Sequence, residues 1–373
     1  MRVLVAPDKF KSSLSADVAA VIMAEAILAV HPTAEIDLQP LADGGEGTMK
    51  TLTEALGGCI TPCQSLDALG RPITSRFGWI EGSRTAVVEM AEASGLWRLT
   101  ADERNPWLAS TFGTGATMKA AMAHGASRVV LGLGGSATND AGAGMAAALG
   151  FRFHNQTEVE VAPIPANFLK IKNVTPPALP VKAIVEGLSD VTSPLLGPLG
   201  ATHVFGPQKG LQPDDAQRLE DAVCYFASVV ERDLGVKVRV RPGAGAAGGL
   251  GFGLMAFCGA ALRSGFDEIA ECTGLEERVI ACDIIVTAEG GMDRQTLHGK
   301  GPGSLAVMAK KHGKRRFAIA GQIADHAALA EIFHLVCPLS PTPLPFEESV
   351  ARTPELLGIT MRNIASLEIF KPM

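Results

Sequence analysis

Acidic, amide and lysine side chains stand directly after four apolar segments that have the pattern of β-strands. These side chains are Asp8 and Lys9, Asp43 and Glu46, Glu289 and Asp293, and Gln322. In an open parallel sheet, ligands bind beyond the carboxyl ends of the strands, so such residues can share one site. Carboxylates at three of the four ends favour a metal–phosphate site, because Mg²⁺ takes one or two carboxylates beside the oxygens of its substrate. The alternative is that these residues only cap helices and form turns.

Residues 131–144, with the sequence LGLGGSATNDAGAG, are a second candidate site. They stand between a predicted strand and a helix that we expect to begin near Gly142. A glycine-rich turn exposes backbone N–H groups and a following helix adds its positive end, so the segment suits an anion such as a phosphate. The candidate donors are Gly134, Gly135, Ser136, Thr138 and Asn139. A tight turn that needs positive φ, with Asp140 as a cap, is the alternative.

Two shorter turns add charged groups. Asp190 lies in the turn at 189–194, after the apolar run Val181–Val185, and so at another predicted strand end. Lys209 lies within 206–210, where its charge can meet a phosphate or a carboxylate. An ordinary turn and a solvated surface lysine are the alternative interpretations.

A glycine pattern at Gly243–Gly248 matches GxGxxG, follows the strand-like segment Val236–Val240 and has Asp267 at a suitable distance for a ribose contact. An NAD(P)-dependent dehydrogenase is therefore an alternative class of enzyme. Pro242 at the junction and the further glycines that follow weaken this interpretation. The P-loop pattern GxxxxGK[ST] is absent, because the sequence around Lys300 lacks the hydroxyl residue.

Alternating strand and helix patterns open and close the chain. Strands are predicted at Arg2–Ala6, Glu35–Leu41, Asp283–Thr287, Arg316–Ala320 and Leu335–Leu339, and helices at Ala16–Val30, Thr48–Leu56, Gly303–His312 and Ala327–Phe333. This rhythm predicts an α/β fold with a parallel sheet that helices cover.

The middle of the chain has a different pattern. Residues 59–92 alternate in short β-like segments separated by turns, which is typical of hairpins. A helix at Thr114–His124, a strand at Arg128–Leu133 and a helix at Asp214–Arg232 are predicted beyond them. We therefore expect two α/β domains: a discontinuous one of residues 1–60 and 281–373, and one of residues 61–280 inserted into it.

Composition narrows the classes of function. The chain has 373 residues, 47% of them hydrophobic, and its net charge of -6 argues against nucleic-acid or anionic-membrane partners. The seven cysteines are scattered without a CxxC pair, so we expect reduced thiols and a cytoplasmic protein without a signal peptide. The uncharged residues 243–262 contain seven glycines and are predicted to form a loop and a buried helix rather than a membrane span.

Nine segments in order along the chain resemble the motifs of the bacterial type I glycerate kinases, and together they cover essentially the whole chain. They are APDKFKSSLSA (6–16), LADGGEGT (41–48), MAEASGL (90–96), RNPWLASTFGTG (104–115), LGLGGSATNDAGAGMAAALG (131–150), DVTSPLLG (190–197), VFGPQKG (204–210), PGAGAAGGLGFGL (242–254) and TAEGGMDRQTLHGKGP (287–302). Ser193, Ala288 and Gly291 depart from the usual pattern of the family, which puts substrate affinity or specificity in question if the arginine missing at 291 contacts substrate.

The resemblance implies that ATP phosphorylates D-glycerate, giving 2-phosphoglycerate and ADP, with Mg²⁺ as the metal. It also implies two α/β domains, one flavodoxin-like and the other inserted into it, with the active site in the cleft between them. A non-catalytic sensor that binds a small acid is the remaining alternative. Nothing in the sequence indicates an oligomeric state.

Phosphoryl transfer needs donors for the phosphates, a metal and a group that orients the acceptor hydroxyl. Within the resemblance, we assign the phosphates to Gly134, Gly135, Ser136, Asn139 and Lys209, and the metal to Glu289 and Asp293. The predicted catalytic residues are Asp190, Lys9 and Asp8. The predicted substrate-binding residues are Asp43, Arg71, Arg104, Gln295 and Thr296, since a cation such as Lys9, Arg71 or Arg104 must meet the carboxylate of glycerate.

Overall fold

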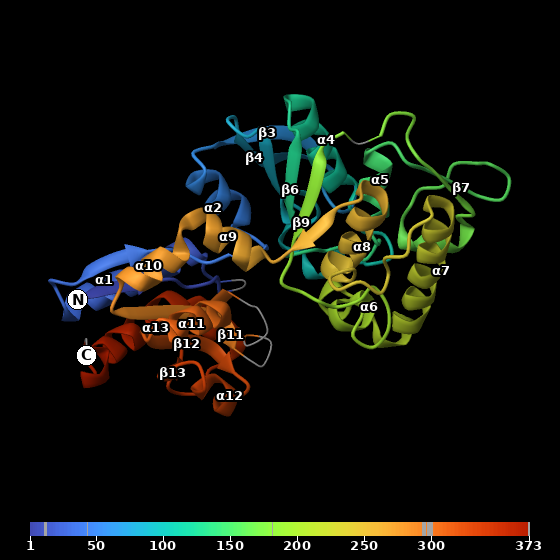
Figure 1. Cartoon of the computed structure of the whole chain (residues 1–373). Coiled ribbons are helices and arrows are strands. Elements are labelled where there is room, and N and C mark those ends of the chain that lie inside the picture. Colours follow the sequence, from blue (N-terminus) through green and yellow to red (C-terminus); the bar gives the residue numbers. More distant parts are fainter. Residues whose placement is uncertain (11–12, 43, 181, 293–295, 297–300, 372–373) are drawn as a thin grey trace. The chain divides into compact units, whose positions relative to one another are not determined.

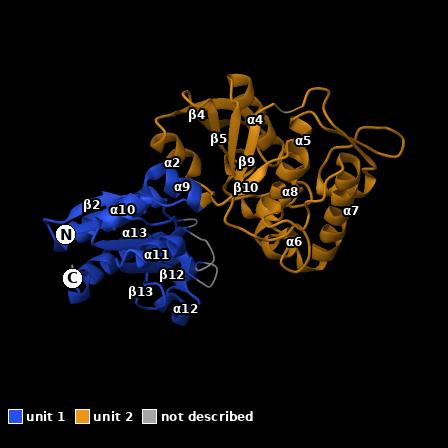
Figure 2. Cartoon of the chain, viewed as in Figure 1, with its two compact units in different colours: residues 1–43, 266–373 blue, residues 44–265 orange. Residues whose placement is uncertain are grey.

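The computed structural model describes the whole chain apart from residues 11–12, 43, 181, 293–295, 297–300 and 372–373. It divides the chain into two compact units (Figure 2): unit 1 is residues 1–43 and 266–373, and unit 2 is residues 44–265. Each unit has its own sheet and hydrophobic core. The α/β class and the presence of parallel sheets are as predicted.

Unit 1 contains a five-stranded parallel sheet (Figure 1). Its strands are β1 (Arg2–Val5), β2 (Glu35–Leu38), β11 (Ile284–Met292), β12 (Arg315–Ile323) and β13 (Leu335–Pro338). They lie in the order β13-β12-β11-β1-β2, and every neighbouring pair is parallel. Counted along the chain within this unit, the order is 2-1-3-4-5, the order of flavodoxin-like sheets. The prediction of a flavodoxin-like domain is confirmed.

Side chains of β1 alternate between two apolar layers, as the period of a strand requires. Val3 and Val5 pack in one core with Met23 and Leu357, which belong to α1 (Ala16–Val30) and α13 (Phe346–Ala365). Leu4 points into the other core. That second core also holds residues of α9 (Gly265–Thr273), α10 (Leu275–Ala281) and α11 (Gly301–Lys311). Helices therefore cover both faces of the sheet; α12 (His326–Ala330) packs near β13.

Unit 2 contains a six-stranded mixed sheet. In spatial order its strands are β10 (Ala261–Arg263), β9 (Ile184–Leu188), β6 (Arg128–Gly132), β5 (Thr85–Glu89), β4 (Pro72–Ile80) and β3 (Cys59–Leu66). The first four are parallel, whereas β4 and β3 form the predicted antiparallel meander with β5. β7 (Arg152–His154) and β8 (Asn173–Thr175) form a separate pair. The helices are α2 (Thr48–Ala55), α3 (Ala91–Ser94), α4 (Phe112–His124), α5 (Ala143–Ala148), α6 (Ala201–Phe205), α7 (Ala216–Leu234) and α8 (Ala246–Cys258).

The units meet at residues 43/44 and 265/266, whereas the sequence analysis placed the boundaries near 60 and 280. Helix α2 accounts for the first difference, because it packs on β4 and β5 of unit 2. A Cβ added at Gly78 would lie 1.8 Å from the Thr53 hydroxyl oxygen, so glycine lets this helix lie directly on the strand. Helices α9 and α10 account for the second, since Phe266, Ala270 and Val279 belong to a core of unit 1. A hydrophobic pattern shows which face is buried but not which sheet buries it.

All seven cysteines are free thiols, as expected. No helix in the described part of the chain is long and apolar enough to cross a membrane. Residues 246–258 form the buried helix α8 predicted for the uncharged stretch.

Candidate functional site

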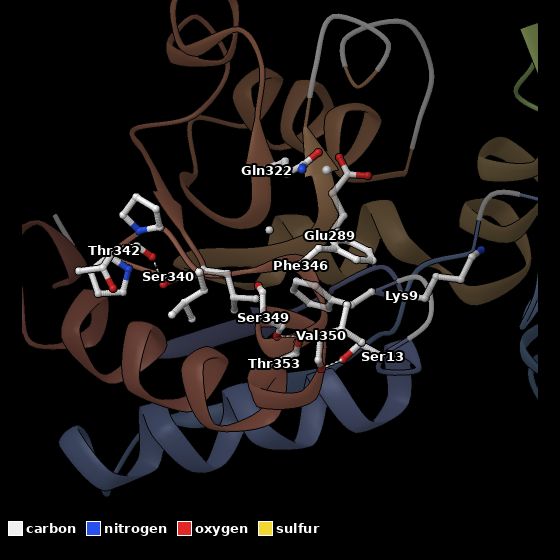
Figure 3. Close-up of a pocket in the computed structure, with 18 of the residues that line it drawn as sticks. Lys9, Ser13, Glu289, Gln322, Ser340, Thr342, Phe346, Ser349, Val350 and Thr353 are labelled. Carbon is white, nitrogen blue, oxygen red and sulfur yellow. Dashed lines mark hydrogen bonds between the residues drawn. The ribbon is translucent and has the colours of Figure 1, made fainter. Parts of the chain in front are cut away.

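A cavity of about 760 Å³ opens at the carboxyl ends of the strands of unit 1, and all its lining residues belong to this unit (Figure 3). Its lining includes Asp8 and Lys9, which follow β1, and Glu289, which lies within β11. These two strands are adjacent, and the chain turns in opposite directions from them, which makes their junction the switch point of the sheet. Ligands of flavodoxin-like sheets bind at this place.

Backbone pairing between β1 and β11 positions the polar end of the cavity. The Asp8 N–H donates to the Ala288 carbonyl at 2.7 Å, and the Lys9 N–H donates to the Asp8 carboxylate at 2.7 Å. Glu289 is only 6% exposed, and its Oε1 accepts a hydrogen bond from the Thr296 hydroxyl at 3.0 Å. Asp8, Lys9 and Glu289 therefore line one cavity of unit 1. Thr296 lies beside them through its hydrogen bond to Glu289.

Three residues proposed for this site, Asp43, Asp293 and Gln295, lie outside the described residues. Gln322, which lies within β12 near its carboxyl end, also lines the cavity. Sequence reasoning noted Gln322 at its strand end but assigned it no role. Phe346 and Ser349 of α13 were missed altogether, because nothing in their local sequence connects them with strand ends that lie far away along the chain.

In unit 2, the glycine-rich segment 131–144 packs tightly against residues 44–46. A Cβ on Gly134 would lie 2.2 Å from the Gly45 Cα, so only glycine fits at this position. The Gly134 N–H donates to the Gly44 carbonyl at 3.2 Å. Gly135 has φ +71° and is exposed, as a turn that presents its backbone requires.

The N–H groups of Gly135 and Ser136 donate no hydrogen bond within the part of the chain that the structure describes. A Cβ on Gly135 would lie 2.7 Å from a carboxylate oxygen of Glu46, which the sequence analysis placed among the candidate residues at the strand ends. The turn therefore holds two N–H groups that have no acceptor among the described residues, beside one carboxylate. Two backbone donors suit a phosphate oxygen.

Asp140 holds the end of this turn. Its buried carboxylate accepts hydrogen bonds from the N–H groups of Thr111, Gly142 and Gly144 and from the Thr111 hydroxyl, at 2.7–3.2 Å. Burial raises the pKa of Asp140, and the hydrogen bonds act in the opposite direction. Asp140 therefore anchors the start of α5 (Ala143–Ala148), in line with the alternative interpretation as a cap.

Lys209 lies beneath the same turn. Its side chain is 0% exposed, and its Nζ donates to the Thr138 carbonyl at 2.6 Å. Burial lowers the pKa of Lys209 from 10.5 to about 7, against the effect of nearby Asp140, which raises it. In this arrangement the ammonium supports the turn from below rather than reaching its exposed side.

Two buried polar atoms beside Lys209 have no hydrogen-bond partner among the described residues. They are the Thr138 hydroxyl oxygen and the Asn139 Oδ1. The Asn139 amide nitrogen donates to the Thr202 hydroxyl at 3.1 Å. Asn139 is thus placed inside the turn by α6 (Ala201–Phe205), with its acceptor oxygen still unused.

The remaining predicted residues of unit 2 lie apart from this turn or are engaged elsewhere. Asp190 follows β9, where its Oδ1 accepts from the Ser264 hydroxyl at 2.8 Å and from the Gly265 N–H at 2.9 Å. Arg71 forms ion pairs with Asp67 and Glu103, which raise its pKa. Arg104 has a buried Nε without a partner among the described residues.

The glycines at 243–253 do not form a dinucleotide-binding turn. Residues 236–240 form no strand, so the predicted segment before the GxGxxG pattern is wrong. Ala247, Gly248 and Gly249 have positive φ inside α8. A Cβ on Gly248 would lie 1.8 Å from the Thr138 carbonyl oxygen and 2.8 Å from the Lys209 Nζ. These glycines allow close packing beneath the 131–144 segment, so the dehydrogenase alternative loses its support.

Comparison with known proteins points in one direction. The model of the family described as the glycerate kinase family matches residues 3–368. A protein of Bacillus subtilis named glycerate kinase is 39% identical over 100% of this chain and 99% of its own length. A protein of Escherichia coli named glycerate 2-kinase is 37% identical over 87% of this chain and 86% of its own.

A crystal structure assigned as glycerate kinase 2 of Salmonella typhimurium LT2 matches with a TM-score of 0.78 and 36% sequence identity, covering 98% of this chain and 97% of that one. Family model, relatives and structure agree over nearly the full length. The chain therefore belongs to the glycerate kinase family.

Proposed function

We propose that this protein transfers the γ-phosphoryl group of ATP to the 2-hydroxyl of D-glycerate, giving 2-phosphoglycerate and ADP, and that both units contribute to the active site. Family membership supports the kinase class, and the Escherichia coli relative carries the name glycerate 2-kinase. The observation that carries the proposal is the joint presence of Asp8, Lys9 and Glu289 in one cavity at the switch point of a nucleotide-binding type of sheet.

Magnesium fits the part of the cavity lined by Asp8, Lys9 and Glu289. Mg²⁺ is usually held by one or two carboxylates together with substrate phosphates. In the proposal Glu289, with Asp8 beside it and Asp293 as a further candidate, holds the ion. No group of three metal-binding side chains lies together among the described residues. When bound, Mg²⁺ neutralises charge on the phosphate oxygens.

The donors of unit 2 are assigned to the transferred phosphoryl group. The N–H groups of Gly135 and Ser136 supply hydrogen bonds. Because Gly134 has no side chain, the turn can pack closely against Gly45. Lys209, buried behind the turn, contributes its positive charge and holds the turn through its hydrogen bond to the Thr138 carbonyl. Fixed backbone donors of this kind stabilise negative charge without reorganisation during the reaction.

For the carboxylate of glycerate, Lys9, Arg71 and Arg104 remain the candidates. Lys9 lines the cavity of unit 1. Asp67 and Glu103 already hold Arg71, whereas the buried Nε of Arg104 lacks a partner among the described residues. These contacts favour Lys9 and Arg104 over Arg71.

Asp190 is proposed to orient the acceptor hydroxyl. Asp190→Asn separates this role from a structural one, because the amide oxygen can still accept from Ser264 and Gly265 while the negative charge is lost. We expect kcat to fall by about 10²-fold or more with unchanged thermal stability. Ser264→Ala, which removes one donor and no charge, is the matched control. Near wild-type turnover of Asp190→Asn would exclude the role.

The direct test of the proposed function is ADP formation by the purified protein with ATP, Mg²⁺ and a panel of small hydroxy acids. We expect turnover with D-glycerate above all, and a phosphorus NMR signal of 2-phosphoglycerate rather than its 3-isomer. Binding of glycerate without consumption of nucleotide would instead support the sensor alternative.

A further inference from the structure

The cavity of unit 1 extends well beyond the polar strand ends. At 760 Å³ it lies within the range of about 300–1,000 Å³ that is typical of sites for ligands of drug size. A three-carbon acid would occupy a small part of it. The size of the cavity therefore calls for a larger ligand than glycerate alone.

The two ends of the cavity differ in chemistry. The end at β1 and β11 carries Asp8, Lys9 and Glu289. The other end is lined by residues between 339 and 353, which follow β13 and begin α13, and none of its described lining side chains is charged. It consists of leucines, prolines, a valine and a phenylalanine together with hydroxyl residues. A ligand that fits must be charged at one end, and flat or apolar with a few hydrogen-bonding groups at the other.

Phe346 is the main apolar group at the uncharged end. It begins α13, and 72% of its side chain is exposed although it lines the cavity. Covering an exposed aromatic ring with a flat ligand is favourable in free energy. Any of the nucleobases can stack on such a ring, because every base has a π-face. Figure 3 shows Phe346 with Ser349 and Val350 of the same helix around the hollow.

Helix α13 holds this wall in place. The Ser13 hydroxyl donates to the Val350 carbonyl at 2.8 Å and ties the helix to the segment after β1. The buried Thr353 hydroxyl donates to the Ser349 carbonyl at 2.9 Å, within the helix itself. The uncharged end is thus formed in advance and does not depend on unit 2.

We propose that the uncharged end of this cavity, at residues 339–353, binds the nucleoside part of the phosphoryl donor, with the base against Phe346. The phosphates then extend toward Lys9 and the carboxylates at the switch point. This inference rests on the proposed function, because it takes the donor to be a nucleotide. It adds a subsite made of residues that carry none of the roles proposed above.

The test compares Phe346→Ala and Ser349→Phe with Val307→Ala, whose side chain is 51% exposed on α11 and does not line the cavity. Binding of ADP and of inorganic tripolyphosphate is measured by calorimetry on the full chain, together with the KM for ATP and for D-glycerate. Removal of the ring weakens ADP binding and raises the KM for ATP by roughly tenfold, as expected for one stacked base. Ser349→Phe fills the subsite and has at least as large an effect.

Binding of tripolyphosphate and the KM for D-glycerate stay within about twofold of wild type in both cavity variants, and Val307→Ala changes nothing. The proposal is overturned if ADP binding is unchanged in both variants, or if the KM for D-glycerate rises instead of that for ATP. If the wild-type protein binds ADP in a way that depends on Phe346 but phosphorylates no glycerate, the proposed function fails while the nucleoside subsite stands.

Discussion

The buried lysine beneath the 131–144 segment makes the stability of unit 2 depend on pH. Lys209 is fully buried, and its pKa lies at about 7 in the folded protein. In the unfolded chain a lysine keeps its proton up to about pH 10.4. Between these values the unfolded state binds more protons than the folded state, so the free energy of unfolding rises with pH.

Lys209→Met removes this titration while keeping a side chain of similar length. One pKa unit corresponds to about 1.4 kcal/mol, and roughly half of the folded molecules have lost the proton at pH 7. From pH 7 to pH 9 the free energy of unfolding of the wild type should therefore rise by about 2 kcal/mol relative to the variant.

The protein offers a probe confined to the relevant unit, because its three tryptophans, Trp79, Trp97 and Trp107, all belong to unit 2. Urea unfolding followed by tryptophan fluorescence at pH 7, 8 and 9 measures the difference. Lys119→Met, which changes an exposed lysine of α4 in the same unit, is the control and should show no such trend. A difference that stays flat or falls as pH rises would refute the assignment of Lys209 as a buried, partly neutral amine.

Two further substitutions test the packing around the same turn. Gly248→Ala should prevent folding of unit 2 or lower its Tm by more than about 10 °C, because the new Cβ would lie 1.8 Å from a carbonyl oxygen. Gly57→Ala is the control, since Gly57 also has positive φ but open space around it. This control should lower the free energy of unfolding by only about 1 kcal/mol. Equal melting temperatures of the two variants would contradict the close packing of Gly248 against the Thr138 carbonyl. Thr111→Val removes a hydroxyl that donates to Asp140 and accepts from the Met145 N–H. We expect the free energy of unfolding, measured with urea, to fall by about 1–3 kcal/mol. A decrease of less than about 0.5 kcal/mol would count against this hydrogen-bond network.

Several features of the fold follow from local sequence. The helix at Ala16–Val30 was predicted to the residue, because Ser15 accepts from the Val18 N–H as an N-cap and the apolar positions follow a helical period. The strands beginning near Arg2 and Leu335 likewise follow from short apolar runs between polar turns. Their parallel arrangement follows from the alternation of strands with helices.

Other features depend on contacts between distant residues. The segment at Val236–Val240 has the composition of a strand but pairs with none of the described strands and forms a loop and a turn. The glycines that follow it match a nucleotide-binding pattern and instead make room for Thr138 and Lys209. A pattern of glycines shows where a side chain is not tolerated, but not which neighbouring atoms exclude it.

The sequence by itself determined the α/β class, the flavodoxin-like order of unit 1 through the family resemblance, and the candidate residues at the strand ends, because strand patterns and turn residues act over a few positions. The tertiary structure alone decided that α2 belongs to unit 2, that Lys209 is buried beneath a turn, and that Phe346 faces the same cavity as Asp8. These outcomes depend on which surfaces are buried together, and burial is set by packing between segments far apart in the chain.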